Sequence, residues 1–448
     1  MFFSVILVMT DSPKILSTDF EDANRKTVNS QPIEGGTCTP VSSSLPPGVP
    51  EDLWPTFLQC VSCDRPITAL SSLPTCPHCH SSVLKGHYDL SGLDRHQWIQ
   101  TLRQRPPSLW RYQELLPALK PQHRVTLGEG YTPLVPALRL GAAWGANHVY
   151  LKDERQNPTG SFKDRQATVA LSILKARGVQ RLVLASTGNV GIAYAAYGSR
   201  AGIATTIFFP QDVPPEKVRE TQVYGSTVVQ LPKNYDETKV AAAQFAQAEG
   251  WFLDQGVKGF AGVESMKTMA FEIAEQLGWR SPDWYIQGVS GGLGPIGVAK
   301  GFEELLALGL VDKVPALGLI QTAGCDPLVQ AWKAGAAEVT AIDHPKTTIL
   351  PLATGNPGVS YPILKALLDR HGGAMTTVTD EVAFDTLRRV AGQEGISVEP
   401  ATAVAIAGTL DLIDQGIIAP HETVIINCSG HTYPVSQAIL DRRQLKAN

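Results

Sequence analysis

The 448-residue chain has no long hydrophobic run, no excess of one charge and few cysteines. Because no apolar stretch approaches the ~18 residues that a membrane-spanning helix requires, we expect no membrane partner. Lys and Arg number 38 and Asp and Glu 42, which gives a formal net charge of −4. With no basic excess to neutralise phosphates, nucleic acid is not an expected partner either. Seven cysteines are sparse for a disulfide scaffold of this length, and an odd number leaves one unpaired.

The first 50 residues differ in composition from the rest of the chain. The opening MFFSVILVM is apolar but has no basic start and is not followed by a cleavage site of small residues, which disfavours a secretory signal. Acidic residues further along disfavour a transit peptide. From 30 to 50 the chain is rich in Ser, Thr, Pro and Gly without periodicity, which is typical of a linker. We therefore expect residues 1–50 to be a disordered or linker tail and the protein to be cytoplasmic.

Four of the seven cysteines form two CxxC pairs, Cys60/Cys63 and Cys76/Cys79. Each pair can bring two thiolates to one ion, and a hairpin between the pairs can close a tetrahedral site. Two disulfides or a chance spacing are the alternatives, and a reducing compartment disfavours the disulfides. We expect a structural zinc ribbon over residues 51–91. Since four protein ligands would complete the metal's coordination, the ribbon is not the expected active site.

From about residue 92 onward, short apolar runs alternate with helical patterns. This alternation predicts βαβ units and an α/β fold with twisted, mostly parallel sheets. Ligands in such folds bind where strands end and helices begin. Strands are expected at 149–151, 181–185, 204–209, 226–231, 284–289, 317–321 and 423–427, and helices at 162–177, 190–201, 235–249 and 402–415.

The first informative junction reads NPTGSFKDR and puts Lys163 in the first turn of an expected helix. A lysine at the positive end of a helix dipole is unfavourable, so it is either solvated or functional. The dipole and desolvation both lower the pKa of such an amine and make it a nucleophile suited to a Schiff base. Lys163 is therefore a candidate catalytic residue.

Two further junctions carry small polar residues and glycines. At the end of the strand 181–185, the hydroxyls and free N–H groups of Ser186-Thr187-Gly188-Asn189 can hold a carboxylate, although one of these residues could serve only as a helix cap. After the strand 284–289, the loop SGGLGPIG (290–297) lets the backbone approach a phosphate closely. It has no GK[ST] ending and no GxGxxG pattern, which disfavours a nucleoside-triphosphate loop.

Together these motifs resemble the threonine synthase family of fold-type II pyridoxal-phosphate (PLP) enzymes. The resemblance implies a tryptophan synthase β-like fold over residues 92–448, with a smaller lobe of roughly 175–285 inserted in a larger one. Fold-type II enzymes are commonly dimers, so a homodimer is expected. In some members of the threonine synthase family a cysteine ribbon precedes the catalytic body. The resemblance rests on motifs that occur in the same order as in the family: GEGYTPL (128–134), NPTGSFKDR, ASTGN (185–189), the glycine-rich loop, GISVEPA (395–401) and SGH (429–431).

The resemblance also implies a role for individual residues. Lys163 would bind PLP covalently and later move the substrate's α-proton. Asn189 would hydrogen-bond the cofactor's O3′, and Ser429 would contact its pyridine nitrogen. A hydroxyl does not stabilise a pyridinium, which suits elimination and replacement better than transamination. The remaining implied positions are Gly291, Gly292, Leu293 and Gly294 for the cofactor phosphate, and Ser186 and Thr187 for the substrate carboxylate.

Three stretches depart from the family's pattern. This chain has GHTYPV (430–435) where the family usually has GHGLKD, and GGLGP where the family has a GNAGN-like loop. It has Gln166 where the family has a small residue.

The expected function is a threonine synthase-like lyase that converts O-phosphohomoserine and water to threonine and phosphate. One alternative is PLP-dependent β-replacement or β-elimination on phosphoserine- or serine-like substrates, as in cysteate synthase or serine/threonine dehydratase. Another is an inactive paralogue that acts as a zinc-ribbon binding module, which the intact Lys163, Asn189 and Ser429 argue against.

Overall fold

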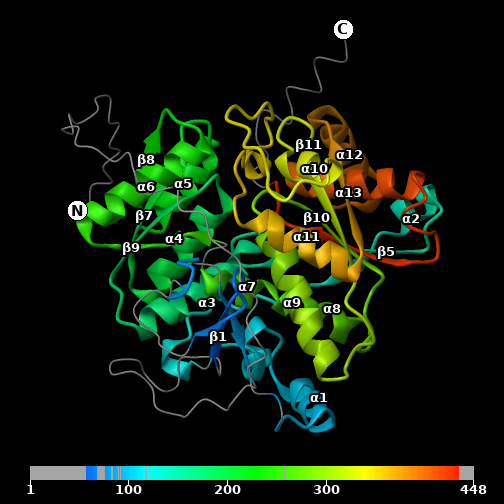
Figure 1. The fold of residues 1–448 in the computed structure, drawn as a ribbon, viewed down its shortest axis with the longest axis horizontal. Coiled ribbons are helices and arrows are strands. Elements are labelled where there is room, and N and C mark those ends of the chain that lie inside the picture. The colour runs from blue at the N-terminus through cyan, green and yellow to red at the C-terminus, as the bar shows by residue number, and fades with distance from the viewer. Residues whose placement is uncertain are drawn as a thin grey trace, which may run out of the picture.

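The computed structural model describes residues 57–67, 76–81, 84–88, 90, 92–117, 119–256 and 259–432. The expected tail, with Cys38, and the residues 433–435 of the divergent motif lie outside these ranges. Figure 1 shows two sheet regions side by side, with β7, β8 and β9 on the left and β5, β10 and β11 on the right. Within the described ranges, no helix is both long enough and apolar enough to cross a membrane.

The larger sheet has six strands in the order β12-β11-β10-β13-β5-β4. All neighbours are parallel except β4, which runs antiparallel to β5 at one edge. The strands are β4 (Leu134–Pro136), β5 (His148–Asp153), β10 (Trp284–Gly288), β11 (Ala316–Thr322), β12 (Gly373–Val378) and β13 (Thr423–Cys428).

Helices cover both faces of this sheet. Ile425 and Ile426 of β13 are both buried, yet they belong to different hydrophobic cores. Because successive side chains of a strand point to opposite faces, α8 and α9 pack on one face and α12 and α13 on the other. The helices of this region are α1 (Arg95–Gln104), α2 (Leu138–Trp144), α8 (Thr268–Gln276), α9 (Leu293–Ala307), α10 (Pro327–Lys333), α11 (Ser360–His371), α12 (Asp380–Glu394) and α13 (Pro400–Asp414).

The smaller sheet has four parallel strands in the order β8-β7-β6-β9. All seven strands expected from the sequence are present in the two sheets, with ends that differ by at most two residues. The strands are β6 (Arg181–Ala185), β7 (Ala204–Pro210), β8 (Thr227–Leu231) and β9 (Phe252–Leu253). The helices around them are α3 (Lys163–Ala176), α4 (Asn189–Ala201), α5 (Pro215–Val223), α6 (Tyr235–Glu249) and α7 (Phe260–Met266).

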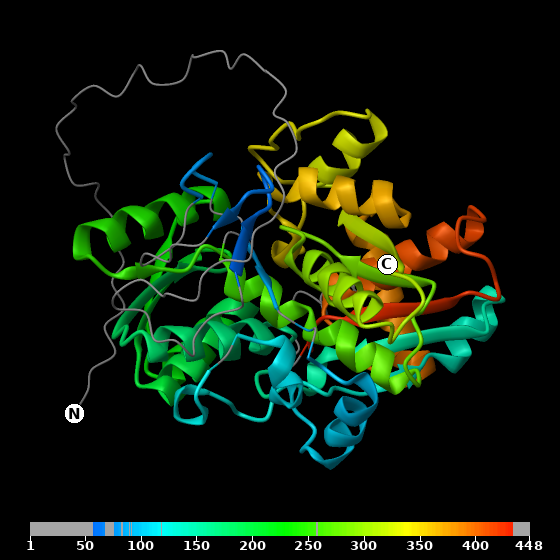
Figure 2. The ribbon, with the colours of Figure 1, turned by 60° about the horizontal axis from the view of Figure 1, so that its bottom comes forward.

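The cysteine-bearing segment forms a separate antiparallel sheet of three short strands in the order β2-β1-β3. Its strands, blue in Figure 2, belong to neither larger sheet. Glu264 of α7 fastens it to the body by accepting hydrogen bonds from the Gly86 N–H (3.1 Å) and the Tyr88 hydroxyl (2.7 Å). The strands are β1 (Phe57–Cys60), β2 (Pro66–Ile67) and β3 (Leu84–His87), and the 3-10 segments of the chain are η1 (Leu109–Leu115), η2 (Pro121–His123), η3 (Glu154–Gln156) and η5 (Leu350–Leu352).

Candidate active site and cysteine cluster

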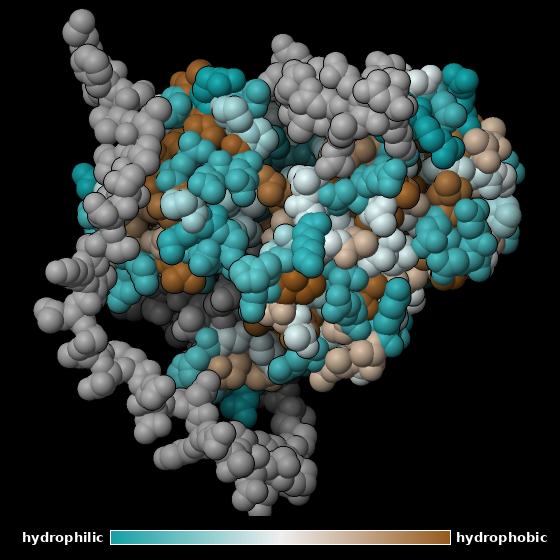
Figure 3. Space-filling view, turned by 90° about the horizontal axis from the view of Figure 1, so that it is seen from above, coloured by the Kyte–Doolittle hydropathy of each residue, from teal (hydrophilic) through white to brown (hydrophobic). Residues whose placement is uncertain are grey.

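The candidate site residues follow the carboxyl ends of strands from both sheets. Lys163 begins α3 after β5, Asn189 begins α4 directly after β6, and Ser429 follows β13. Together with Thr187 and the glycine-rich loop 291–294 they line one cavity of about 640 Å³. Seen from above, the outer surface mixes hydrophilic and hydrophobic residues, in keeping with the near-neutral charge (Figure 3). The fold therefore brings nearly all of the predicted positions to one cavity.

Lys163 supplies an amine that is poorly solvated. Its Nζ lies 4.1 Å from the centroid of the Phe162 ring, and among the described residues no carboxylate oxygen lies within 4.0 Å of it. Burial lowers the pKa of the Lys163 amine to about 8, against the opposing effect of the more distant Glu399 and Asp254. An amine with this pKa has a larger neutral fraction near pH 7 than an ordinary lysine, which makes it better suited to attack a carbonyl group.

Backbone hydrogen bonds hold Lys163 beside the segment that carries Ser429. The Phe162 N–H donates to the Ser429 carbonyl at 3.0 Å, and the His431 N–H donates to the Gly160 carbonyl at 2.9 Å. Two motifs that lie far apart in the sequence are thus joined directly, so the amine and the Ser429 hydroxyl have a fixed relation.

Glu399 bridges two of the predicted cofactor ligands. Its Oε2 accepts a hydrogen bond from Asn189 Nδ2 and its Oε1 accepts one from Ser429 Oγ, each at 2.8 Å. Glu399 lines the cavity directly before Pro400, the first residue of α13. Glu399 lies in the GISVEPA motif, but the motif by itself predicts no role for it. The sequence signal that could have identified Glu399 is its carboxylate directly before a proline that begins a helix.

The glycine-rich loop forms a part of the wall that could hold a phosphate. A side chain at Gly291 would meet no atom within 4 Å, and Gly292 adopts a φ of +73° immediately before α9. The first N–H groups of this 15-residue helix have no partner within the helix, and its dipole favours an anion. The Ser290 and Thr354 hydroxyls hydrogen-bond to each other and tie the loop to the segment that contains Thr354. The donors and the space available fit a phosphate group.

Ser186 and Thr187, both predicted to face the substrate, occupy different environments. Thr187 lines the cavity, whereas the buried Ser186 does not. The Ser186 hydroxyl accepts hydrogen bonds from the N–H groups of Gly188 (3.0 Å) and Gly191 (2.9 Å). Its oxygen therefore stabilises the turn between β6 and α4, and its substrate-binding role stays a prediction.

Asp254 also lines the cavity, although no sequence motif marks it as a site residue. It follows the two-residue strand β9, which is too short to give a recognisable hydrophobic pattern. Tyr194 donates its hydroxyl hydrogen to Asp254 at 2.7 Å, and Gln166 in turn donates to the Tyr194 oxygen at 3.3 Å. Burial raises the pKa of the Asp254 carboxyl. Gln166, the divergent position, lines the cavity itself and is linked to Asp254 through Tyr194.

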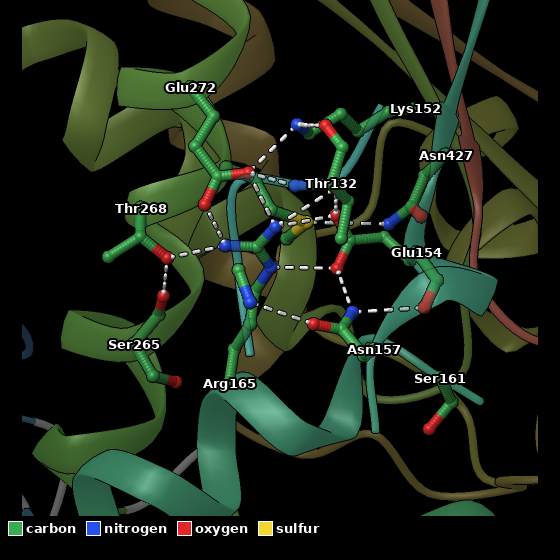
Figure 4. A network of polar contacts seen from close by, with 12 residues as sticks. Thr132, Lys152, Glu154, Asn157, Ser161, Arg165, Ser265, Thr268, Glu272 and Asn427 are labelled. Atoms are coloured by element: carbon green, nitrogen blue, oxygen red, sulfur yellow. Dashed lines mark hydrogen bonds and ion pairs between the residues drawn. The ribbon is translucent and has the colours of Figure 1, made fainter. Parts of the chain in front are cut away.

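Four charged residues that we call the Arg165 cluster (Lys152, Glu154, Arg165 and Glu272) form a network of polar contacts (Figure 4) and are fully buried. Arg165 contacts Glu154 Oε2 with its Nε at 2.7 Å and Glu272 Oε2 with its Nη2 at 2.7 Å. Lys152 Nζ lies 2.8 Å from Glu272 Oε2. Burial alone would raise the pKa of the Glu272 carboxyl, but the adjacent Arg165 and Lys152 cations lower it to about 2. All four charges are therefore mutually compensated.

The four predicted metal ligands come together in the ribbon. The ligand atoms of Cys60, Cys63, Cys76 and Cys79 all lie within 4.8 Å of one another. The sulfur atoms of Cys60 and Cys79, and of Cys63 and Cys76, are 3.5 Å apart, well beyond the ~2.05 Å of a disulfide bond. The disulfide alternative is therefore wrong for this structure.

The two CxxC turns have the same backbone pattern. In the first, the Asp64 N–H donates to the Cys60 carbonyl and the Cys60 N–H to the Arg65 carbonyl. In the second, His80 and Ser81 take the corresponding places around Cys76. Asp64 and His80 also share a left-handed conformation, with φ of 57° and 60°. Such paired turns direct four thiols to one point, which is compatible with a zinc ribbon.

Cys325 and Cys428 are buried free thiols, as the sequence analysis expected. Burial raises the pKa of the Cys325 thiol to about 12, so it is not a reactive thiolate at neutral pH.

Comparison with known proteins identifies the family. Residues 125–430 match the family described as "Pyridoxal-phosphate dependent enzyme". The chain is 34% identical over 385 residues to a threonine synthase of Methanosarcina acetivorans, covering 86% of this chain and 93% of the relative. It is 33% identical to a threonine synthase of Methanocaldococcus jannaschii, covering 83% and 91%.

A solved structure shows the same fold at lower identity. The processed form of threonine deaminase isoform 2 from Solanum lycopersicum aligns with a TM-score of 0.59 and 22% identity, covering 78% of this chain and 93% of that one. This likeness confirms the predicted fold-type II architecture. The chain therefore belongs to the threonine synthase family of pyridoxal-phosphate-dependent lyases.

Proposed function

We propose that this protein converts O-phosphohomoserine and water to threonine and phosphate with PLP bound at Lys163. The observation that carries the proposal is the Lys163 amine, which faces the cavity without an ion pair among the described residues and has a lowered pKa. Threonine synthases at 33–34% identity over most of the chain support the choice of substrate.

PLP, when bound, would supply an electron sink for the carbanion formed at the substrate's α-carbon. Lys163 would hold the cofactor covalently and then move protons at the α- and β-carbons. Asn189 would donate to the ring oxygen O3′, Ser429 would face the pyridine nitrogen, and Thr187 would face the substrate carboxylate together with Ser186. Gly291, Gly292, Leu293 and Gly294 would surround the cofactor phosphate.

A substrate panel on the purified, PLP-loaded protein tests this function. With O-phosphohomoserine, phosphate and threonine should appear in equal amounts, and Lys163→Ala should abolish both products and the visible absorption of bound PLP. A protein that gains no visible absorption with PLP would contradict the proposal, as would absorption that survives in Lys163→Ala.

The charge of the cavity favours a second candidate, β-elimination or β-replacement on a serine-like substrate. The lining residues include the carboxylates Asp236, Asp254 and Glu399 and the amines Lys163 and Lys239, but no described arginine. Such a wall offers little compensation for a dianionic phosphate ester. Pyruvate from serine, or a sulfonate from phosphoserine and sulfite, with no phosphate from O-phosphohomoserine, would support this alternative.

We also propose that Cys60, Cys63, Cys76 and Cys79 hold a structural Zn²⁺. The convergence of four sulfur atoms and the matching turns support a closed tetrahedral site without a catalytic position. Metal analysis should find about one Zn²⁺ per chain. Cys60→Ser should lower stability more than turnover. Cys325 is a buried thiol outside the cluster, so the Cys325→Ser variant should keep the metal. A metal content well below one would contradict the site.

The division of the chain and its assembly are further proposals. We infer a tail over residues 1–50, a ribbon over 51–91 and a catalytic body over 92–448, with a smaller lobe at roughly 175–285. The described cysteines are free thiols, which supports a reducing compartment such as the cytoplasm. We propose a homodimer, and analytical ultracentrifugation of the full chain tests it directly.

A further inference from the structure

Lys217 lies behind Asn189, on the side away from Glu399. It belongs to the first turn of α5, and its Nζ donates a hydrogen bond to Asn189 Oδ1 at 2.7 Å. Asn189 Nδ2 donates to Glu399 Oε2 at 2.8 Å. A lysine has only donors and an ionised carboxylate only acceptors, so these partners allow one orientation of the Asn189 amide. The second hydrogen on Nδ2 is left for the cavity that Asn189 lines.

The turn before α4 is shaped around this lysine. Gly188 has a φ of +145°, and a side chain there would lie 2.7 Å from Lys217 Cδ and 3.0 Å from Nζ. Any residue other than glycine would therefore collide with the lysine as well as being strained. The contact of the Lys217 side chain with Asn189 thus depends on a glycine at position 188.

A second feature of Lys217 is its electrostatic surroundings. It is partly buried, and no carboxylate oxygen of a described residue lies within 4.0 Å of its Nζ. Burial lowers the pKa of the amine, opposed by the more distant Glu399 and Glu220. A lysine with a lowered pKa and no paired carboxylate, in contact with a residue that lines a cavity, is a candidate functional position.

We propose that Lys217 is a positioning residue for the cofactor: it fixes the Asn189 amide with its N–H toward the cavity and strengthens that N–H as a donor to an anionic oxygen. A cation on the amide oxygen polarises the amide, and linked hydrogen bonds reinforce one another. The class of ligand atom is an ionised ring oxygen such as O3′ of PLP. Lys217 can act in this way only if PLP binds beside Asn189, as proposed above.

The test uses full-length protein freed of cofactor and titrated with PLP. Lys217→Met, which keeps an apolar stem of similar length, should raise the Kd for PLP about tenfold. It should also lower the fraction of bound PLP that absorbs in the visible, because that absorption requires an ionised ring oxygen. Arg219→Met removes an exposed cation from the same helix and should leave both readouts unchanged.

A double-mutant cycle separates positioning from a general effect on the fold. In an Asn189→Ala background, Lys217→Met should change the Kd by less than about twofold, because the residue through which it acts is gone. Thermal unfolding of the cofactor-free variants shows whether they fold, and Lys217→Gln replaces Lys217→Met if that variant does not.

Two results would overturn the role of Lys217: an unchanged Kd and spectrum in the single variant, or an equal loss in the Asn189→Ala background. If wild-type protein binds no PLP at all, it is the proposed function that fails.

Discussion

The Arg165 cluster and the candidate active-site cavity both hold poorly solvated charges, but in opposite arrangements. In the cluster, two cations and two carboxylates are fully buried and paired, with Lys152 and Arg165 both contacting Glu272. Lys163, which lines the cavity, and Lys217, which contacts the lining residue Asn189, have no carboxylate oxygen of the described chain within 4.0 Å of their amines. The nearest hydrogen-bond partner of Lys217 is a neutral amide.

This difference separates charges that hold the fold from charges that are available to ligands. Removing a charge from water costs several kcal/mol, which a partner at hydrogen-bond distance offsets. Where no partner is present, the cost appears as a lowered pKa, as for the Lys163 amine. The comparison predicts large stability losses in the cluster and small ones at Lys163.

The largest expected effect is at Arg165. Arg165→Met should lower the free energy of unfolding by about 3–5 kcal/mol, because it leaves Glu154 and Glu272 buried with only Lys152 to compensate them. Urea unfolding of the cofactor-free protein measures this loss. Lys365→Met, which breaks the solvent-accessible pair with Asp369, is the control and should lower the free energy of unfolding far less than Arg165→Met does. If the two variants lost equal amounts of unfolding free energy, the buried cluster would contribute no more to stability than the solvent-accessible pair.

The next effect is the pH dependence of PLP capture. The neutral Lys163 amine is the nucleophile, and its pKa is about 8. Below that pH the protonated form dominates, so the rate of covalent capture should rise about tenfold per pH unit and level off above pH 8. Stopped-flow absorbance with cofactor-free protein measures the rate. A rise that continues toward pH 10.5, the usual lysine value, would mean that the amine is solvated.

The smallest expected effect is on stability at Lys163. Its folded-state pKa is depressed, so at pH 7 the protonated amine opposes folding, and this penalty disappears as the pH rises through the two pKa values. Lys163→Met should therefore leave the unfolding free energy at pH 7 within about 1 kcal/mol of wild type, or raise it slightly. Urea unfolding at pH 7 tests this. A loss as large as that of Arg165→Met would mean that Lys163 has a structural partner.

Much of the fold follows from local patterns in the chain. Runs such as 181–185 and 423–427 are apolar enough to be strands, and they form β6 of the smaller sheet and β13 of the larger one. Strand β12 was not expected, because it begins at Gly373 after another glycine and contains two threonines. Strand β9 has only two residues and carries no periodicity. Asp254, which follows β9, was missed for the same reason.

The sequence by itself determined the candidate residues of this protein: Lys163 at a helix start, Asn189 and Ser429 at strand ends, glycines before α9, and cysteines in two CxxC pairs. Only the tertiary structure decided how they are used. Burial by the folded chain lowers the pKa of Lys163. Hydrogen bonds join Glu399 to Asn189 and Ser429, and Lys217 to Asn189, although these residues lie in separate segments of the chain. Desolvation and hydrogen bonding depend on which groups are in contact in the folded protein, and local sequence patterns do not specify these long-range contacts.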